Sequence, residues 1–412
     1  MKKLIKEQIK RAVRMATGKQ IEIVDRYTHD ANALANVYNV TGDMLRQPQQ
    51  HPERVRWGQE LIAHWYVPAF DHPYYGGAMT ILRIAAHMRK HMGIRPRFLV
   101  CGSIDCANAK RKYVEAFPTL ADCDVWQIDS QALIDTLPFA DFSFATLWTT
   151  AYVLQKISNT GLKFYLVQDY EPLFYPAGST SAQAALTYHF GFHGIANTQS
   201  IREEIEGHGM QAIHLTPQVD PEIFHNRGVD LRNENRPIKL FFYGRPGHPR
   251  NAFELASIGL RLAKEHLGDQ IDIVSAGAGW DVAAYGLQGI IRPLGLLPYR
   301  ETGDLYRSCH LGFVMMMTKH PSYLPFEMMA CGTVVITNQN PANRWFLKDN
   351  ENCLLTAPAA SCIAERIIHA VKSYNELTQI REFGVKSITE NYSNWEHELS
   401  GVATHIQKMR VG

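Results

Sequence analysis

This sequence has little excess charge of either sign. Its 412 residues include 42 Lys and Arg against 40 Asp and Glu, which gives a formal net charge of +2. A broad nucleic-acid-binding face needs a basic surplus, so we expect no nucleic-acid partner. The sequence also lacks runs of about twenty apolar residues, the length that a membrane-spanning helix needs. We therefore expect no membrane span and no signal peptide. We expect the protein to be cytoplasmic.

Cysteine gives no sign of a disulfide framework or a zinc site. The 7 cysteines are odd in number and scattered, and they lack zinc-site spacing with nearby histidines. We predict reduced thiols in apolar surroundings and no metal site. Asp122-Cys123-Asp124 has the form of a metal-binding Asp-x-Asp motif, but it precedes a predicted strand, and we interpret it as chance. Gly277-Ala278-Gly279 lacks the further glycine and acidic residue of a dinucleotide fingerprint, so a tight turn is the better interpretation.

Alternating strand and helix patterns fill the chain and predict an α/β protein with parallel sheets. Because 412 residues are many for a single core, we expect two domains of roughly 200 residues each. A segment rich in Asn, Arg, Asp and Gly separates them and is typical of a linker. The predicted divisions are an N-terminal helical extension over 1–57, a first domain over 58–225, a linker over 226–237, a second domain over 238–390 and a C-terminal segment over 391–412.

The first 19 residues combine apolar positions at helical spacing with many lysines and arginines. Such a basic amphipathic helix could lie on an anionic membrane surface, as a peripheral contact at the inner face of the cell membrane. The alternative is a surface helix that packs on its own domain. The sequence gives no indication of oligomeric state.

The stretch Thr318–Thr337 lies between two apolar runs and follows a strand, loop, helix, strand order. We predict that Ser322 caps the helix, that Pro325 lies in its first turn and that Gly332 adopts a left-handed conformation just after it. Such a loop directs backbone N–H groups towards the sheet edge, which suits phosphate. Glu327, about one turn into the helix, could accept two hydroxyl hydrogen bonds from a ribose. The alternative is an ordinary solvated glutamate.

Two carboxylates follow the apolar run Lys163–Val167, which we predict to be a buried strand. Asp169 and Glu171 lie there among aromatic residues, in Gln168–Pro176. Ligand-handling groups gather at the carboxyl ends of strands in open α/β sheets. Acids can bind sugar hydroxyls or accept protons, and rings stack on sugar faces, so this segment indicates a sugar site. A capped, aromatic-filled loop is the alternative.

Two further turns have residues that suit phosphate. Arg245 and Arg250 lie in a turn after the predicted strand Ile238–Tyr243, and a guanidinium fork binds phosphate oxygens two at a time. Gly76 and Gly77 open a predicted helix and permit close approach of a ligand to the backbone. Solvated arginines and an ordinary glycine turn are the alternatives.

The segment Glu327–Val335, Glu-Met-Met-Ala-Cys-Gly-Thr-Val-Val, resembles the C-terminal domain of nucleotide-sugar glycosyltransferases with the two-domain GT-B fold. The resemblance implies that Glu327 holds the nucleotide ribose and that Arg245 and Arg250 grip the donor pyrophosphate. Arg250 replaces the lysine that the family has. Lys319 stands where the family has a first glutamate, which leaves the donor-sugar contacts and the inverting or retaining course open.

Two motifs resemble a narrower group, the bacterial rhamnan and S-layer-glycan rhamnosyltransferases. They are Asp-Tyr-Glu-Pro-Leu-Phe-Tyr-Pro at 169–176 and His-Pro-Ser-Tyr-Leu-Pro-Phe-Glu at 320–327. The resemblance implies two Rossmann-like domains that face across a cleft, with a C-terminal helix that crosses back to the first. It also implies transfer of L-rhamnose from dTDP-L-rhamnose to an oligosaccharide or lipid-linked glycan acceptor, without a metal or cofactor. The candidate base is Asp169, with Glu171 second. The remaining implied donor contacts are Gly76, Gly77, Gly277, Leu297, Tyr299, Lys319, Ser322 and Tyr323.

Other functions remain open on the sequence. A GT-B transferase could use a UDP- or GDP-linked sugar. A catalytically silent GT-B scaffold could bind glycan, and a sugar-phosphate epimerase could share the double fold.

Overall fold

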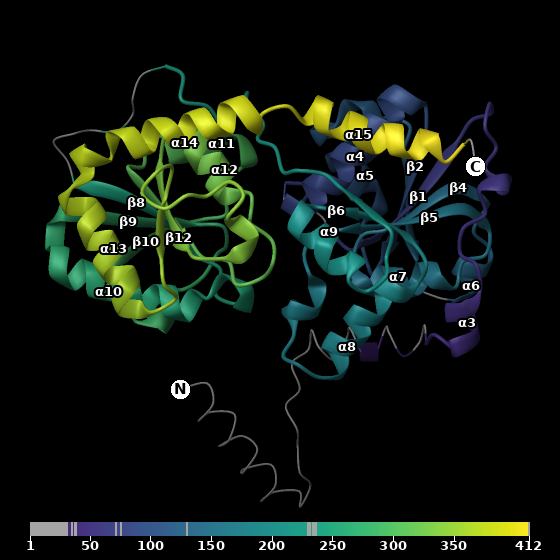
Figure 1. The fold of residues 1–412 in the computed structure, drawn as a ribbon, viewed down its shortest axis with the longest axis horizontal. Helices are drawn as coiled ribbons and strands as arrows, with labels where there is room; N and C mark the ends of the chain where they lie inside the picture. Colours follow the sequence, from purple (N-terminus) through teal and green to yellow (C-terminus); the bar gives the residue numbers. More distant parts are fainter. Residues whose placement is uncertain are drawn as a thin grey trace, which may run out of the picture.

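The computed structural model describes residues 32–33, 36, 39–70, 72–74, 76–128, 131–228, 232 and 237–410. The basic arm over 1–19 lies outside these residues. No helix within the described ranges is both long and apolar enough to cross a membrane. The described chain forms two α/β domains, each built on a parallel sheet (Figure 1).

The first sheet has seven parallel strands in the order β3-β2-β1-β4-β5-β6-β7. The strands are β1 (Ile62–Pro68), β2 (Arg95–Cys101), β3 (Asp124–Ile128), β4 (Ala140–Ala145), β5 (Thr160–Val167), β6 (His193–Ala196) and β7 (Ala212–His214). Every residue of β5 is buried, as expected for a strand covered on both faces. The strand order reverses between β1 and β4, where open α/β sheets usually place ligands at the carboxyl ends of strands.

The helices of this domain are α3 (Gly42–Arg46), α4 (Gly76–Met92), α5 (Cys106–Ala116), α6 (Gln131–Asp135), α7 (Trp148–Gln155), α8 (Ser179–Leu186) and α9 (Gln199–Glu206). The predicted opening of α4 at Gly76-Gly77 is confirmed. Helix α9 is capped by Thr198, whose hydroxyl accepts a hydrogen bond from Ile201 N.

The second sheet has six parallel strands in the order β10-β9-β8-β11-β12-β13. They are β8 (Ile238–Tyr243), β9 (Ile271–Ala276), β10 (Ile291–Gly295), β11 (Leu311–Val314), β12 (Val334–Asn338) and β13 (Leu354–Thr356). The helices are α10 (Phe253–Leu267), α11 (Tyr299–Arg307), α12 (Leu324–Ala330), α13 (Ala360–Lys372) and α14 (Thr378–Asn391). Strand β11 ends at Val314, and beyond it Met317 N donates a hydrogen bond to Arg250 O.

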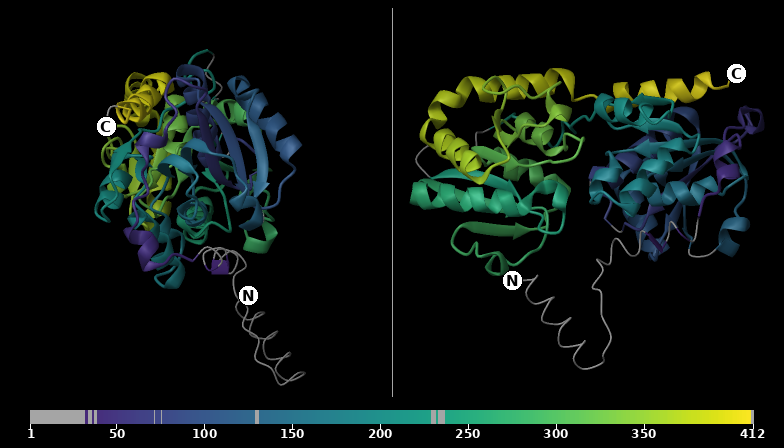
Figure 2. Two further views of the ribbon diagram at one scale, coloured as in Figure 1. Left: turned by 90° about the vertical axis from the view of Figure 1, so that its right-hand side faces the viewer. Right: turned by 60° about the horizontal axis from the view of Figure 1, so that its bottom comes forward.

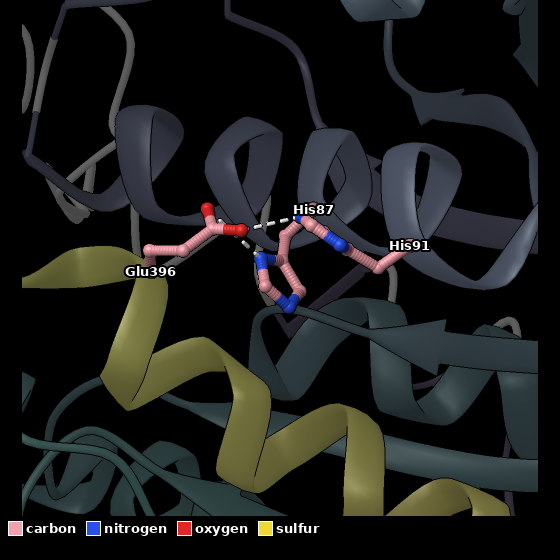
Figure 3. A group of neighbouring side chains, drawn as sticks. All are labelled: His87, His91 and Glu396. Atoms are coloured by element: carbon pink, nitrogen blue, oxygen red, sulfur yellow. Dashed lines mark ion pairs between the residues drawn. The ribbon is translucent and has the colours of Figure 1, made fainter.

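The last helix, α15 (Trp395–Lys408), crosses from the second domain to the first. Two views show α14 over one domain and α15 over the other (Figures 1 and 2). Leu399, Val402 and Ile406 are buried in the core of the first domain. The first turn of α15 also meets α4, where Glu396 pairs with His91 (Figure 3). The predicted return of the C-terminal helix is therefore confirmed.

Candidate functional site

Asp169 follows β5 by two residues and reaches the second domain. Its Oδ2 accepts a 2.8 Å hydrogen bond from the Thr318 hydroxyl, and its Oδ1 accepts one from Tyr170 N. The side chain is buried. Burial raises the pKa of Asp169 to about 6, and the positive charge of Arg250 limits the rise. A carboxylate with this pKa can both hold and release a proton near neutral pH.

The two arginines of the predicted phosphate turn lie at the carboxyl end of β8. The Arg250 guanidinium lies 4.9 Å from the ring centroid of Phe174, in the first domain. Arg245 donates to the Tyr243 hydroxyl at 3.1 Å and contacts His248 Nε2 at 2.7 Å. Burial and the positive charges of the two arginines lower the pKa of His248 to about 4, so it is neutral between two cations. The two arginines therefore concentrate positive charge at this turn, and the charge of Arg250 acts on Asp169.

The loop before α12 contacts the first domain through Tyr323. Its hydroxyl lies 2.8 Å from the hydroxyl of Thr80 on α4 and 3.1 Å from Asn197 Nδ2, just after β6. A Cβ added at Gly76 would lie 3.2 Å from the Tyr323 ring, so the first turn of α4 leaves room for this ring. His320 adds a 3.1 Å contact to Asn197. We call Asp169, Asn197, Arg250, Thr318 and Tyr323 the interdomain site.

The predicted cap at Ser322 is wrong. Helix α12 begins at Leu324 with Tyr323 at its cap position and no side-chain cap bond, while Ser322 Oγ accepts only a 3.4 Å contact from Leu324 N. Ser322 has a positive φ of 66°, which directs its N–H to His320 Nδ1 at 2.9 Å. The residues predicted around it are in place: Pro325 lies in the first turn, and Gly332 has φ +74°.

Glu327 lies in α12, half-buried. Within the described part of the chain, its carboxylate has no hydrogen-bond or ion-pair partner. Burial raises its pKa to about 8. Burial raises the pKa values of Tyr299 and Tyr306, and the nearby charge of Glu327 adds to the rise. Tyr243 also raises the pKa of Tyr306, and its hydroxyl accepts the hydrogen bond from Arg245. Tyrosine rings therefore lie between the Glu327 carboxylate and the arginine turn.

Lys319 points to the first domain. It forms an ion pair with Glu204 and lies 5.7 Å from the ring centroid of Tyr170. Lys319 therefore has an acidic partner across the domain boundary.

Tyr299 makes an aromatic contact across the boundary between the two domains. Its ring stacks on that of Tyr74 at 5.7 Å and an interplanar angle of 9°. Leu297 is half-buried and packs, like Tyr299, against an apolar core cluster of the second domain.

The two remaining predicted glycines permit close packing. Gly277 has φ +114°, and a Cβ there would lie 2.5 Å from the Tyr243 ring. A Cβ on Gly77 would lie 3.4 Å from Gln168 Nε2. At both positions the backbone therefore packs closely against a neighbouring side chain.

Glu171, unlike Asp169, has its carboxylate contacts within the first domain. Its Oε2 accepts hydrogen bonds from Trp148 N at 2.6 Å and from the Tyr165 hydroxyl at 2.9 Å, and it is only 2% exposed. Burial raises its pKa to about 8. Because its carboxylate is enclosed by the first domain, this arrangement favours a structural role for Glu171 over a role as base.

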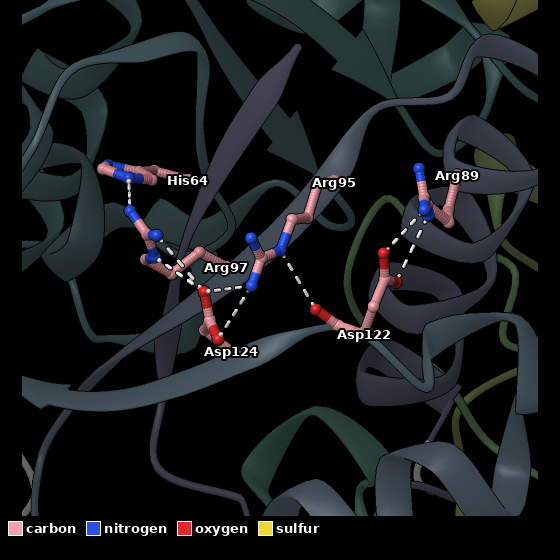
Figure 4. Close-up of polar contacts among 6 residues, drawn as sticks. All are labelled: His64, Arg89, Arg95, Arg97, Asp122 and Asp124. Carbon is pink, nitrogen blue, oxygen red and sulfur yellow. Dashed lines mark hydrogen bonds and ion pairs between the residues drawn. The ribbon is translucent and has the colours of Figure 1, made fainter. Parts of the chain in front are cut away.

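The Asp-x-Asp sequence at the start of β3 has arginine partners (Figure 4). Asp124 Oδ2 lies 3.3 Å from Arg95 and 3.2 Å from Arg97, and Asp122 pairs with Arg89 at 2.6 Å. Ion pairs across the sheet edge therefore account for both carboxylates.

Sequence reasoning assigned no role to Thr80, Asn197, Thr318 or His320. Asn197 directly follows β6, so the rule that ligand groups gather at strand ends could have identified it. His320 begins the motif at 320–327, which gave it no role of its own, and Thr80 carries no local pattern that distinguishes it.

Two parallel α/β domains, joined at the carboxyl ends of their strands and crossed by a C-terminal helix, define the GT-B fold. Residues 238–368 match the family model described as "WsaF, C-terminal domain". The O-antigen biosynthesis protein RfbC of Myxococcus xanthus is 41% identical over 351 residues. That alignment covers 84% of this chain but 27% of RfbC, so the chain spans about a quarter of this relative.

Solved structures share the fold at low sequence identity. HepE of Anabaena, in complex with UDP and glucose, has a TM-score of 0.66 and 14% identity, with 84% of this chain and 99% of HepE covered. The pneumococcal O-GlcNAc transferase GtfA, in complex with UDP and GlcNAc, has a TM-score of 0.62 and 10% identity, with 85% and 99% covered.

Proposed function

We propose that this protein is a glycosyltransferase that moves L-rhamnose from dTDP-L-rhamnose onto a growing glycan chain. The observation that carries the proposal is the meeting of Asp169, Thr318 and Arg250 at the carboxyl ends of both sheets. The O-antigen biosynthesis description of RfbC and the sugar-nucleotide complexes of proteins with this fold support the reaction class. The rhamnosyl donor rests on the motifs at 169–176 and 320–327.

In the proposed reaction, Asp169 accepts the proton of an acceptor hydroxyl. The hydroxyl oxygen then attacks the anomeric carbon, and the bond from this carbon to the diphosphate oxygen breaks. The electron pair leaves with the diphosphate, whose charge Arg245 and Arg250 stabilise without a metal. A β-linked donor then gives an α-linked product, and this inversion requires a base on the acceptor side.

Glu327 would bind the nucleotide ribose. A ribose diol has two hydroxyl donors, and the Glu327 carboxylate lacks a donor among the described residues. Hydrogen bonds to the charged form would lower its raised pKa and keep it ionised. Nucleotide binding would therefore compensate for the cost of burying this charge.

A UDP-linked donor is the second candidate, because HepE and GtfA both contain UDP. Thermal unfolding with dTDP, UDP and GDP separates the donors, since a ligand that binds only the folded state raises the midpoint. We expect the largest shift with dTDP. A larger shift with UDP would reject dTDP-L-rhamnose as the donor in favour of a UDP-sugar. No shift with any of the three nucleotides would favour the catalytically silent scaffold.

The transfer itself is tested with dTDP-L-rhamnose and methyl α-L-rhamnoside, by measuring the disaccharide and released dTDP. We expect Asp169→Asn to lose transfer by about 10²-fold or more, the usual contribution of a positioned base, while its dTDP-dependent midpoint shift remains. Asp269→Asn, at an exposed position of the second domain, is the matched control. Unchanged transfer in Asp169→Asn would remove this residue as the base.

A further inference from the structure

Two histidines and a glutamate that are not part of the interdomain site meet where α15 crosses α4. His87 and His91 are four residues apart on α4, so their rings lie on one face of the helix. Glu396, in the first turn of α15, points towards both (Figure 3). His91 Nε2 lies 2.5 Å from Glu396 Oε1, and one ligand atom from each residue lies within 4.8 Å of the others.

The buried member of this cluster is His87. It is only 6% exposed, and its Nδ1 has no hydrogen-bond partner among the described residues. Glu396 Oε2 lies 3.7 Å from Nδ1, which is beyond hydrogen-bond distance. Buried polar side-chain atoms usually have a partner, so this nitrogen needs an explanation. Burial also lowers the pKa of His87, so the ring is neutral and can present a lone pair.

We propose that His87 Nδ1, His91 Nε2 and a carboxylate oxygen of Glu396 bind a divalent transition-metal ion. Two imidazole nitrogens and one carboxylate oxygen form a donor set typical of Zn²⁺, with water in the fourth position of a tetrahedron. The ion supplies the partner that His87 Nδ1 lacks. It also replaces the close contact between His91 and Glu396 by coordination of both groups.

The position of the cluster gives the ion a structural role. Glu396 directly follows Trp395, whose ring lies 6.3 Å from that of Tyr323 and 4.9 Å from the guanidinium of Arg83 on α4. The ion would therefore fix the start of α15 on α4, next to a residue of the interdomain site. This role does not depend on the proposed transferase activity.

Zn²⁺ binding to the EDTA-treated full chain tests the proposal, by calorimetry and thermal unfolding. We expect one site and a midpoint that rises with Zn²⁺ concentration. His91→Ala and Glu396→Gln should each weaken Zn²⁺ binding by at least about tenfold, because even outer-shell changes at metal sites often have that effect. Co²⁺ substitution should give the d–d absorption of a low-coordinate site, and both variants should lose it.

Lys90→Ala is the matched control. Lys90 Nζ lies 3.6 Å from Glu396 Oε1, so it belongs to the same ion-pair group without offering a metal ligand at neutral pH. It should bind Zn²⁺ at least as tightly as the parent chain. His91 is 37% exposed in its side chain, so its variant should fold, and its midpoint without metal checks this. The proposal is overturned if Zn²⁺ does not stabilise the parent chain, or if His91→Ala binds Zn²⁺ as the parent does.

Discussion

The hydroxyl of Thr318 donates a hydrogen bond of 2.8 Å to the carboxylate of Asp169, although the two residues are 149 positions apart. Asp169 follows β5 of the first sheet, and Thr318 follows β11 of the second. The contact places the candidate base against the loop that carries the predicted donor residues. Its hydrogen bond also lowers the pKa of Asp169 against the effect of burial.

Replacing Thr318 should therefore move the pH dependence of transfer. Thr318→Val removes the hydrogen bond and leaves Asp169 buried, so the pKa of Asp169 should rise above about 6. Hydrogen bonds to charged groups contribute about 1.5–3 kcal/mol, which corresponds to a shift of roughly one to two pH units. Because the base acts when ionised, the acidic limb of the pH–rate profile should move to higher pH.

Thr318→Ser is the control for this prediction, because serine retains the hydroxyl. It should keep the acidic limb near that of the parent chain. A limb in the same place in the parent and in Thr318→Val would show that Asp169 does not set the pH dependence.

Glu327→Gln should stabilise the free protein and weaken nucleotide binding. The folded-state pKa is about 8, above the ordinary value of 4.5, so the folded state binds more protons than the unfolded state between these values. The carboxyl group therefore costs stability as pH rises from 4.5 to 8. The variant should match the parent near pH 4 and exceed it by up to about 4–5 kcal/mol near pH 8, because 8 less 4.5 is about 3.5 pKa units and each unit corresponds to about 1.4 kcal/mol.

Denaturant unfolding at several pH values measures this gain, and Glu301→Gln, at an exposed position on α11, is its control. If Glu327 binds ribose, the same variant should bind dTDP roughly tenfold more weakly, as expected from the loss of a charged hydrogen bond. Equal dTDP affinity would reject the ribose assignment while leaving the stability result unaffected.

The Lys319–Glu204 ion pair separates a structural role for Lys319 from a role in donor binding. The side chains are 43% and 32% exposed, so the pair should contribute only about 0–1 kcal/mol. The double variant Lys319→Glu with Glu204→Lys should restore the thermal midpoint that either single variant lowers. If Lys319 also contacts the donor, the double variant should still have a raised KM for dTDP-L-rhamnose. A restored KM would limit Lys319 to the ion pair.

Gly277→Ala should be strongly destabilising, whereas Gly279→Ala should be close to neutral. Gly277 has φ +114°, and a Cβ there would lie 2.5 Å from the Tyr243 ring. Strain of this kind costs roughly 1–3 kcal/mol, and the overlap adds to it. A Cβ on Gly279 would have no heavy atom within 4 Å. Denaturant unfolding of the two variants checks the difference, and equal stabilities would contradict the packing described for this turn.

Local sequence patterns could predict the two sheets because their strands are short, apolar and separated by helices. The fully buried β5 is an example, since its apolar run Lys163–Val167 ends where β5 ends. The same sequence patterns predicted the ends of strands and helices less well. Strand β11 stops at Val314 because Met316 N bonds to the side chain of Asn338, and an apolar run cannot show where such a bond replaces the sheet ladder.

The predicted segments at 168–176 and 318–337 contain much of the candidate site, but their partners could not be predicted. Asn197 bonds to Tyr323 over 126 positions, and no local pattern records such a contact. The metal cluster shows the same limit. The spacing of His87 and His91 is visible in the sequence, whereas the approach of Glu396 depends on the crossing of α15.

Glu171→Gln tests whether the second predicted carboxylate acts in catalysis or in the core. Its Oε2 accepts bonds from Trp148 N at the start of α7 and from Tyr165 of β5, so it joins two elements of the first domain. Burial raises the pKa of Glu171 to about 8, so the group is neutral near pH 7, and an amide oxygen can accept both bonds in its place. We therefore expect the free energy of unfolding at pH 7 to change by less than about 1 kcal/mol. The kcat of the folded variant should stay within about threefold of the parent, a change of less than 1 kcal/mol in the barrier. A loss of kcat with unchanged stability would instead assign Glu171 to the reaction, because a purely structural carboxylate affects the rate only through the fraction of folded protein.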